Sequence, residues 1–271
     1  MPILGGRCDE GLASLVREAQ SFYDSLAERY HLLFGNWDSS VQRQGAVLDA
    51  LIATELGPGQ RRVLDVACGI GTQALGLAAL GHSVHGTDLS PKAVSRLLGE
   101  AARLGVTIPA AVHDMRTLDR LPGEFDVVLA CDNAVPHLLS DADLDLAVRG
   151  MRARLVPRGL LLLSQRDYDD LAQSRPRADT PRVFDEPGGG RRIIFQVWDW
   201  GYDARTYVVH QYMVLERPSG ERDTFHSHAT YRALLRHELN AALAAAGFCE
   251  IRWRFPEETG YYQPIVTARR P

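Results

Sequence analysis

The spacing of hydrophobic and polar positions changes along the chain. From Gly11 to Phe34, and again from Val41 to Leu56, apolar residues recur at intervals of three and four, which predicts two amphipathic helices. Five short apolar runs then alternate with predicted helices over 72–80, 90–104 and 141–155. The runs are RVLDVA (62–67), HSVHGTD (82–88), IPAAVHD (108–114), FDVVLAC (125–131) and RGLLLLSQ (158–165). Runs with so few polar positions are typical of parallel strands covered on both faces, so we expect an α/β fold with a doubly wound, mostly parallel sheet.

After Ser164 the pattern becomes antiparallel. The segments 191–200, 205–217 and 222–232 are strand-like and are separated by turn residues rather than helices. A helix over 234–246 and two last strands at 250–255 and 263–270 follow. We therefore divide the chain into an N-terminal helical lid (1–58), a core (59–170 and 233–271) and an antiparallel β insertion (171–232) that covers a substrate site.

Composition narrows the classes of function. The 271 residues are 45% hydrophobic and 24% charged, and the net charge of −4 provides no whole-molecule field for nucleic acid. The first residues lack the pattern of a secretory leader, and no run approaches the roughly 18 apolar residues of a membrane span. We expect a cytoplasmic protein with no nucleic-acid or membrane partner. Its cysteines (Cys8, Cys68, Cys131 and Cys249) lack the paired spacing of zinc or redox sites and are expected to be small apolar residues.

The stretch VLDVACGIGT, residues 63–72, carries the first candidate site. A strand that stops at Asp65 is followed by Gly69 and Gly71, which let the backbone approach a ligand closely, and by the start of a helix with free N–H groups. The spacing to Ala74 also fits a dinucleotide fingerprint, so NAD and S-adenosylmethionine both remain open. Asp65 suits the cationic amino end of S-adenosylmethionine and would repel a pyrophosphate.

Two further acids end the next strands. Asp88 is placed to accept hydrogen bonds from both ribose hydroxyls. Asp114 is placed to accept from the adenine amino group, and Met115 to pack on the adenine face. Aspartates at strand ends are often plain turn formers. Three of them at successive strand ends favour a nucleoside site.

These motifs resemble those of the class I S-adenosylmethionine-dependent methyltransferases, in LDVACGIGT, GTDLS and HDM. The resemblance implies a Rossmann-like methyltransferase fold, S-adenosyl-L-methionine as cofactor and S-adenosyl-L-homocysteine as product. We also assign Ala67, Leu89 and Cys131, which adjoin the motif residues, to the cofactor site.

A narrower resemblance, to glycine N-methyltransferase and related small-molecule methyltransferases, extends through most of the chain. FYDSLAERYHLLFG resembles that family's N-terminal helix and implies that Tyr23 and Tyr30 close over the cofactor. The family's arginine near the cofactor carboxylate is replaced by Ser40, and Arg43, one turn along, is its predicted substitute. The segment 184–200 shares only an antiparallel character with the family.

The same resemblance assigns the substrate side. CDNAVPHL implies that Asn133 lies near the acceptor amine, with His137 four positions on. QRDYDDL implies that Arg166 holds a substrate carboxylate, and VVHQYMV places Tyr212 near the substrate.

Methyl transfer is an in-line displacement, so positioning the acceptor is most of the catalytic task. Asn133 would orient an amine, whereas a hydroxyl acceptor would need a base, for which His137 is the candidate. His137 is also compatible with a packing role. Arg166 is equally able to pair with Asp169 or Asp170 on the surface.

Other side chains leave two interpretations open. A set of aromatic residues either lines a substrate pocket or consists of ordinary sheet aromatics: Trp198, Trp200, Tyr202, Tyr207 and Tyr212. On strands, His210, His226 and His228 could share one face, but no cysteine or carboxylate joins them at a recognised spacing, so no metal site is predicted.

The sequence thus predicts methyl transfer from S-adenosylmethionine to a small molecule, with an amine nitrogen of an amino-acid-like carboxylate substrate as the acceptor. The alternatives are O-methylation of a larger metabolite with His137 as base, an NAD-dependent oxidoreductase, and a binding module without turnover. Whether the protein is a homo-oligomer stays open.

Overall fold

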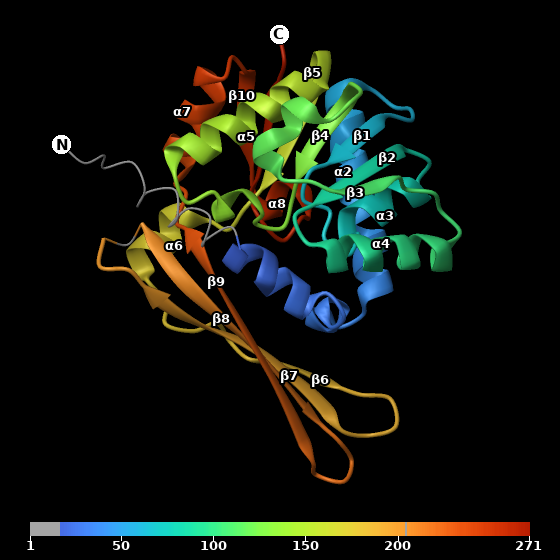
Figure 1. Ribbon diagram of the computed structural model, residues 1–271, viewed down its shortest axis with the longest axis vertical. Helices are drawn as coiled ribbons and strands as arrows, with labels where there is room; N and C mark the ends of the chain where they lie inside the picture. The colour runs from blue at the N-terminus through green and yellow to red at the C-terminus, as the bar shows by residue number, and fades with distance from the viewer. Residues whose placement is uncertain (1–16, 204) are drawn as a thin grey trace, which may run out of the picture.

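The computed structural model describes residues 17–203 and 205–271. A helix over residues 17–26 precedes the numbered elements (Figure 1). These are, in chain order, η1 (Tyr30–Leu33), α2 (Trp37–Leu56), β1 (Arg62–Asp65), α3 (Thr72–Ala79), β2 (Ser83–Asp88), α4 (Pro91–Leu104), β3 (Ala110–Val112), η2 (Met115–Arg120), β4 (Phe125–Ala130), η3 (Val135–His137), α5 (Asp141–Arg154), β5 (Leu155–Ser164), α6 (Tyr168–Ser174), β6 (Arg182–Asp185), β7 (Arg191–Trp200), β8 (Thr206–Glu216), β9 (Arg222–Arg232), α7 (Arg236–Ala245), β10 (Cys249–Arg254), α8 (Pro256–Thr259) and β11 (Ile265–Arg269).

The central sheet has seven strands in the order β10-β11-β5-β4-β1-β2-β3. Its strands pair in parallel except β11, which is antiparallel to both β5 and β10. The strand order reverses beside β1, because the chain adds β2 and β3 on one side of β1 and then β4 and β5 on the other. The predicted doubly wound, mostly parallel sheet is confirmed, and a crevice is expected at the carboxyl ends of its strands.

Helices cover both faces of this sheet because successive strand side chains point to opposite sides. Val63, for example, packs with α2, α3 and α4, whereas its neighbour Leu64 packs with α5 and α7. Both side chains are fully buried. The apolar runs that predicted the strands are therefore apolar because each strand faces two cores.

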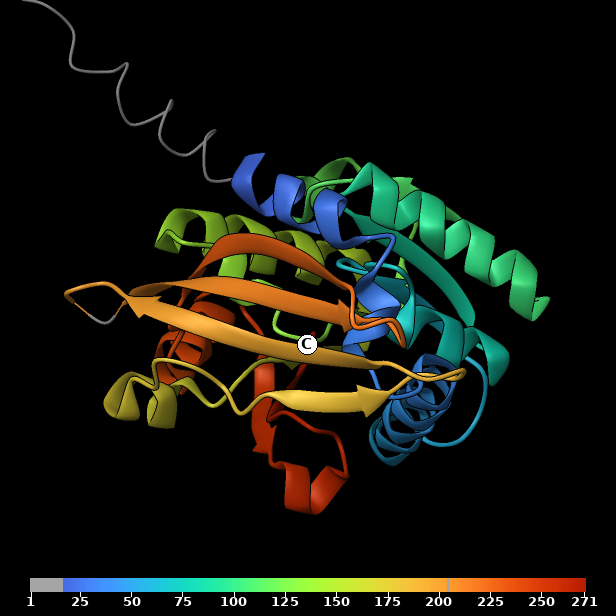
Figure 2. The ribbon, with the colours of Figure 1, turned by 90° about the horizontal axis from the view of Figure 1, so that it is seen from below.

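A second sheet, of four antiparallel strands in the order β6-β7-β8-β9, projects below the central sheet (Figure 1). The three strands of the predicted meander are β7, β8 and β9, and β6 is an additional edge strand. Along β8, odd-numbered residues such as Tyr207 and Val209 are buried and even-numbered ones are half-buried. The buried face packs on Phe22 and Leu26 of the helix over 17–26 in a third core. Figure 2 shows the molecule from below the view of Figure 1, with the second sheet in front.

The N-terminal segment differs from the predicted continuous helix. Residues 11–16 and Cys8 lie outside the described residues, and the helix over 17–26 ends in a turn before η1. Asp24 on that helix accepts a hydrogen bond from the Ser90 hydroxyl at 2.5 Å. Ser90 itself caps α4, accepting from Ala93 N at 3.0 Å ahead of Pro91 in the first turn. This contact fixes the N-terminal helix beside the end of β2.

Among the described helices, none combines the length and apolar character needed to cross a membrane. Cys68 and Cys131 are buried free thiols, as expected of small apolar residues, whereas Cys249 is exposed at the start of the edge strand β10.

Candidate active site

Two cavities meet at the carboxyl edge of the central sheet. The first cavity lies against the turn after β1 and the ends of β2, β3 and β4. The second cavity, of about 900 Å³, lies between this edge, the N-terminal helix and the second sheet. Tyr23, Tyr30 and Asp132 line both cavities and form their junction.

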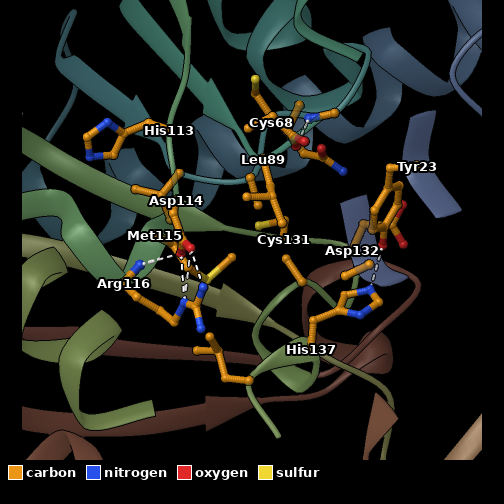
Figure 3. A pocket seen from close by; sticks show the side chains of 18 of the residues that line it. Tyr23, Cys68, Leu89, His113, Asp114, Met115, Arg116, Cys131, Asp132 and His137 are labelled. Atoms are coloured by element: carbon orange, nitrogen blue, oxygen red, sulfur yellow. Dashed lines mark hydrogen bonds and ion pairs between the residues drawn. The ribbon is translucent and has the colours of Figure 1, made fainter. Parts of the chain in front are cut away.

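Most of the predicted cofactor residues line the first cavity (Figure 3). They are Tyr23, Tyr30, Ala67, Gly69, Asp88, Leu89, Asp114, Met115 and Cys131. His137, predicted on the substrate side, lines it as well. Strand ends that are far apart in sequence therefore contribute to one concave surface.

The glycine turn has two distinct parts. Gly69 has φ +52° and open space where a Cβ would stand, so its backbone faces the first cavity. Gly71 has φ +101°, and a Cβ there would lie 2.8 Å from the Leu75 side chain. Gly69 thus leaves room for a ligand, and Gly71 lets α3 begin close to the sheet.

Asp88 is held by the backbone around it. Its Oδ2 accepts from Gly69 N and its Oδ1 from Ser90 N, both at 2.8 Å. Burial raises the pKa of Asp88 in spite of these two bonds. The carboxylate is fixed at the cavity wall with lone pairs left for hydroxyl donors.

Asp114 has a strong protein partner. Arg116 donates to it at 2.5 Å and also reaches Asp143 at 3.1 Å (Figure 3). Burial opposes ionisation of Asp114, but the Arg116 guanidinium outweighs it and holds the pKa of this carboxyl below its usual value. Asp114 is therefore an oriented carboxylate that shares its oxygens with Arg116, and only its remaining lone pairs are open to a ligand.

Asp65 lies beneath the wall of the first cavity, next to the lining residues Val66 and Ala67. Its Oδ1 accepts from Ala67 N at 3.2 Å, and its buried Oδ2 has no partner among the described residues. Burial raises the pKa of Asp65 to about 8. A buried acid with an unsatisfied oxygen is what a ligand ammonium group would complete.

Tyr23 and His137 connect the N-terminal helix to the segment after β4. The Tyr23 hydroxyl lies 2.9 Å from Nε2 of His137, and the His137 ring packs on Tyr231 with centroids 4.1 Å apart (Figure 3). Burial lowers the pKa of His137 to about 4. An imidazole so weakly basic, with Nε2 already engaged, is poorly suited to deprotonate a hydroxyl acceptor.

Asn133 lies in the second cavity at a left-handed φ of +66°. Its Oδ1 accepts from Arg166 N at 3.1 Å and from the Tyr168 hydroxyl at 2.9 Å. Its Nδ2 is buried without a partner in the described part of the chain. Asn133 therefore braces the strand end that carries Arg166 and keeps both N–H donors of its side-chain amide unused.

Arg166 lies in the wall of the second cavity. It donates to the Tyr207 hydroxyl at 2.9 Å and to Gln196 Oε1 at 2.8 Å, and its Cζ stands 4.9 Å from the Trp198 ring centroid. Within residues 17–203 and 205–271, no carboxylate forms an ion pair with it. Its alternative pairing with Asp169 or Asp170 is wrong, because Asp169 pairs with Arg236 at 3.2 Å and Asp170 forms no ion pair with Arg166.

Two predicted residues lie elsewhere. Tyr212 is on the outer face of the second sheet, stacked on Phe195 with centroids 5.0 Å apart, because even-numbered positions of β8 point away from the cavity. Tyr212 therefore borders neither of the two cavities. Arg43 is an exposed residue of α2 that borders the second cavity and not the first, because it projects on the side of α2 that carries Ser40. The structure thus separates Arg43 from the predicted cofactor site.

Among the other aromatics of this region, Trp198, Trp200 and Tyr207 share the inner face of the second sheet, whereas Tyr202 lies in the turn after β7. Trp198 lines the second cavity, Trp200 stacks on Tyr207 with centroids 4.6 Å apart, and Tyr202 is fully exposed. The three histidines cluster on the outer face, where His210 Nδ1 lies 3.1 Å from His226 Nε2. The described residues contain no group of three or more histidine, cysteine or acidic side chains that could hold a metal ion.

Several residues of this site escaped the sequence analysis. Asp132 precedes Asn133 in the motif CDNAVPHL, and its negative charge was the sequence feature that could have identified it. Gln196 and Gln211 follow from the period of two along β7 and β8 once the inward face is known. Tyr262 follows α8 and reaches Asp132, a contact for which the sequence contains no signal.

Comparisons with known proteins agree with this geometry. A family model described as a methyltransferase domain matches residues 63–159. The glycine/sarcosine N-methyltransferase of Parasynechococcus marenigrum is 28% identical over 169 residues, covering 62% of this chain and 58% of that protein. The chain spans a little over half the length of the first such relatives.

Solved structures match over more of the chain. CalS10, an S-adenosylmethionine-bound amino pentose methyltransferase from Micromonospora echinaspora, is 25% identical with a TM-score of 0.67, covering 86% of this chain and 92% of that one. The sugar N-methyltransferase KedS8 from a Streptoalloteichus species shares the fold, with a TM-score of 0.70, 20% identity and coverage of 89% and 92%.

The first cavity fits S-adenosylmethionine on three observations: the unsatisfied buried oxygen of Asp65, the bared backbone at Gly69, and the fixed carboxylate of Asp88. The relatives and solved structures named above are methyltransferases, so they give the NAD alternative no support. The strand order, the cavity and these matches together support a class I S-adenosylmethionine-dependent methyltransferase, with a methyltransferase domain that includes residues 63–159.

Proposed function

We propose that this protein transfers a methyl group to the amine nitrogen of a small molecule that also carries a carboxylate. The observation that carries the proposal is Arg166, a guanidinium in the wall of the second cavity without a carboxylate partner among the described residues. S-adenosylmethionine, when bound, supplies an electrophilic methyl group on its sulfonium sulfur.

The residues of the first cavity would divide the cofactor between them. Asp88 would accept from the ribose hydroxyls, Met115 and Leu89 would contact the adenine, and Asp65 would face the amino group through its unsatisfied oxygen. Tyr23 and Tyr30 would exclude water from the junction, since both are shared by the two cavities.

The second cavity would hold the acceptor. It meets the first at Tyr23, Tyr30 and Asp132, so an acceptor bound there reaches the donor side without leaving the protein. Arg166 presents a planar fork that suits a carboxylate, and Tyr207 and Gln196 fix its orientation. A volume of about 900 Å³ is at the upper end for small-molecule sites and favours an amino acid with a substantial side chain over glycine itself.

Two relatives support an amine acceptor. The bacterial relative at 28% identity is named for glycine and sarcosine N-methylation, and CalS10 for an amino pentose. The weak basicity of His137 counts against the hydroxyl alternative, because its pKa is about 4. Nitrogen is therefore the favoured acceptor atom.

The test is an acceptor panel assayed by mass spectrometry with S-adenosylmethionine. It contains glycine, sarcosine, L-alanine and L-phenylalanine, each beside its carboxamide, and 4-hydroxybenzoate as a hydroxyl acceptor. We expect N-methylation of at least one amino acid, with kcat/KM about 100-fold above that of its amide, since losing a buried charge pair costs about 2 to 5 kcal/mol. Equal turnover of acid and amide would remove Arg166 as a carboxylate anchor. Methylation of the phenol without any amine would overturn the nitrogen assignment.

A further inference from the structure

Asp132 is an acid at the junction of the two cavities. It is the second residue after β4 and lines both cavities. Its Oδ2 accepts from the Tyr30 hydroxyl at 2.7 Å, and its Oδ1 accepts from the Tyr262 hydroxyl. A carboxylate has about four acceptor positions, so two donors leave others open toward the cavities.

The backbone here is strained. Asp132 has φ +59° and Asn133 has φ +66°, and Ser164 holds the turn by accepting from Asp132 N at 2.8 Å through its hydroxyl. Aspartate and asparagine tolerate left-handed φ better than most residues, which explains the residue types. This tolerance does not explain why two successive left-handed residues direct polar side chains into a cavity. Strained backbone of this kind is concentrated at functional sites.

Two charged residues of the second cavity lack an ion-pair partner among the described residues. In the described part of the chain, Asp132 forms no ion pair, and neither does Arg166 across the same cavity. Burial raises the pKa of Asp132, and the Tyr262 and Tyr30 hydroxyls and the charges of Arg166 and Arg182 oppose this rise only in part. Unpaired buried charges are costly, and a molecule with both an ammonium and a carboxylate would neutralise the two together.

We propose that Asp132 binds the ammonium group of the acceptor and removes its proton. This inference rests on the proposed function and extends it by assigning a catalytic base. An amino acid near neutral pH carries an ammonium group whose nitrogen has no free electron pair. When an N–H bond breaks, the pair stays on nitrogen and the proton joins a carboxylate oxygen of Asp132, which later releases it to water in the second cavity.

Charged and titratable groups surround Asp132 on every side. Tyr30 and Tyr262 donate to it, and Arg166 and Arg182 act on it electrostatically from the walls of the second cavity. Tyr23, Tyr231, Tyr261 and Cys131 are the remaining titratable groups near it. All of these tyrosines and the cysteine hold their protons more tightly than usual because burial raises their pKa, so Asp132 is the group of this set suited to accept a proton at neutral pH.

The kinetic test uses Asp132→Asn, which preserves shape and removes the base. The acceptor is whichever of glycine, sarcosine, L-alanine and L-phenylalanine the wild-type protein methylates fastest. At pH 7 we expect kcat/KM to fall about 100-fold or more. It should then rise about tenfold per pH unit toward the pKa of the free amine, because only unprotonated acceptor remains useful to the variant. Asp145→Asn, on the solvent face of α5, is the control and should match the wild type.

A binding measurement supplies a second readout. The same acceptor is titrated into protein saturated with S-adenosylhomocysteine, in two buffers of different ionisation enthalpy. Wild-type protein should bind without net proton exchange, because the proton moves to Asp132. The asparagine variant should release about one proton per acceptor bound, or fail to bind it at pH 7.

The outcomes separate the two proposals. If the wild-type protein methylates none of these amines, the proposed function fails and the base assignment fails with it. If it methylates one and Asp132→Asn keeps the wild-type pH profile, or loses activity equally at every pH, only the base assignment fails. A loss of S-adenosylhomocysteine affinity in Asp132→Asn would place this acid at the cofactor and would also overturn it.

Discussion

The Tyr23 hydroxyl lies 2.9 Å from Nε2 of His137, although 114 positions separate the two residues. The contact joins the N-terminal helix to the segment after β4, at the place where the two cavities meet. The N-terminal helix and the segment after β4 therefore meet at this pair of side chains.

Burial of His137 should make stability depend on pH. Its pKa is lowered from 6.5 to about 4, so the unfolded chain takes up a proton first as the pH falls. The stabilisation is present above pH 6.5 and is lost toward pH 4, by about 3 kcal/mol. Urea unfolding at pH 7 and pH 4.5 should show this loss in the wild type and a smaller one in His137→Gln. Tyr23→Phe should keep the wild-type dependence, because burial and not the hydroxyl lowers the pKa; if it does not, the hydroxyl is the cause.

Arg166→Lys should distinguish a carboxylate anchor from a structural arginine. Lysine keeps the charge and loses the planar fork, so we expect acceptor KM to rise about tenfold or more with kcat less affected. Calorimetry should show unchanged S-adenosylhomocysteine affinity, since Arg166 lines only the second cavity. Arg149→Lys, on the surface of α5, serves as the control. A loss of cofactor affinity in Arg166→Lys would indicate a role in folding the site.

The two faces of β8 provide a matched pair of variants. Tyr207→Phe removes the hydroxyl that orients Arg166, so acceptor KM should rise about tenfold or more, as expected for loss of one hydrogen bond to a charged group. Tyr212→Phe changes the outer face, where that hydroxyl contacts neither cavity, and should leave steady-state kinetics unchanged. The reverse result would return Tyr212 to the substrate side.

How far the sequence predicts this molecule depends on the range of the interactions involved. Asp65, Asp88 and Asp114 end successive strands, and parallel pairing brings such ends to one edge, so the first cavity was predictable. The cavity that each remaining residue borders was not predictable, because one step along a strand exchanges its two faces and the family resemblance did not fix the face of Tyr212. For Arg43 the position around α2 decides that it borders the second cavity and not the first.

The second cavity was less predictable because it depends on tertiary contacts. Tyr262 reaches Asp132 across 130 positions, and Arg166 meets Tyr207 across 41. No local pattern encodes either distance. The N-terminal helix likewise ends after residue 26 although residues 17–34 contain no proline or glycine, and its Phe22 and Leu26 pack against the second sheet.

Gly76 and Gly99 should respond to alanine in opposite directions. A Cβ at Gly76 of α3 would lie 2.4 Å from the Val41 carbonyl oxygen and 2.8 Å from Gly45 Cα, so α2 and α3 would have to separate. We expect Gly76→Ala to lower the free energy of unfolding by about 1 to 3 kcal/mol. Gly99 is exposed on α4 with open space around it, and Gly99→Ala should raise this free energy by about 0.5 to 1 kcal/mol. Urea unfolding measures both, and a neutral Gly76→Ala would contradict the close helix contact.

Asp65 should stabilise the bound state at the expense of the free protein. Its pKa is about 8 in the folded chain against 3.8 ordinarily, so as the pH rises from 4 to 8 the unfolded chain releases the proton first and stability falls. Asp65→Asn removes this loss. Without ligand at pH 8, its free energy of unfolding in urea should exceed that of the wild type by about 2 to 4 kcal/mol, and near pH 4 the two should differ little.

The same variant should bind S-adenosylhomocysteine at least about tenfold more weakly, because an amide cannot neutralise the ligand ammonium. In the wild type at pH 7, binding should release about one proton as Asp65 ionises beside that ammonium, which calorimetry in two buffers detects. Asp65→Asn should release none. Greater stability with unchanged affinity would show that the acid does not face the ligand, and lower stability at pH 8 would show that the carboxylate is ionised and held by the protein alone.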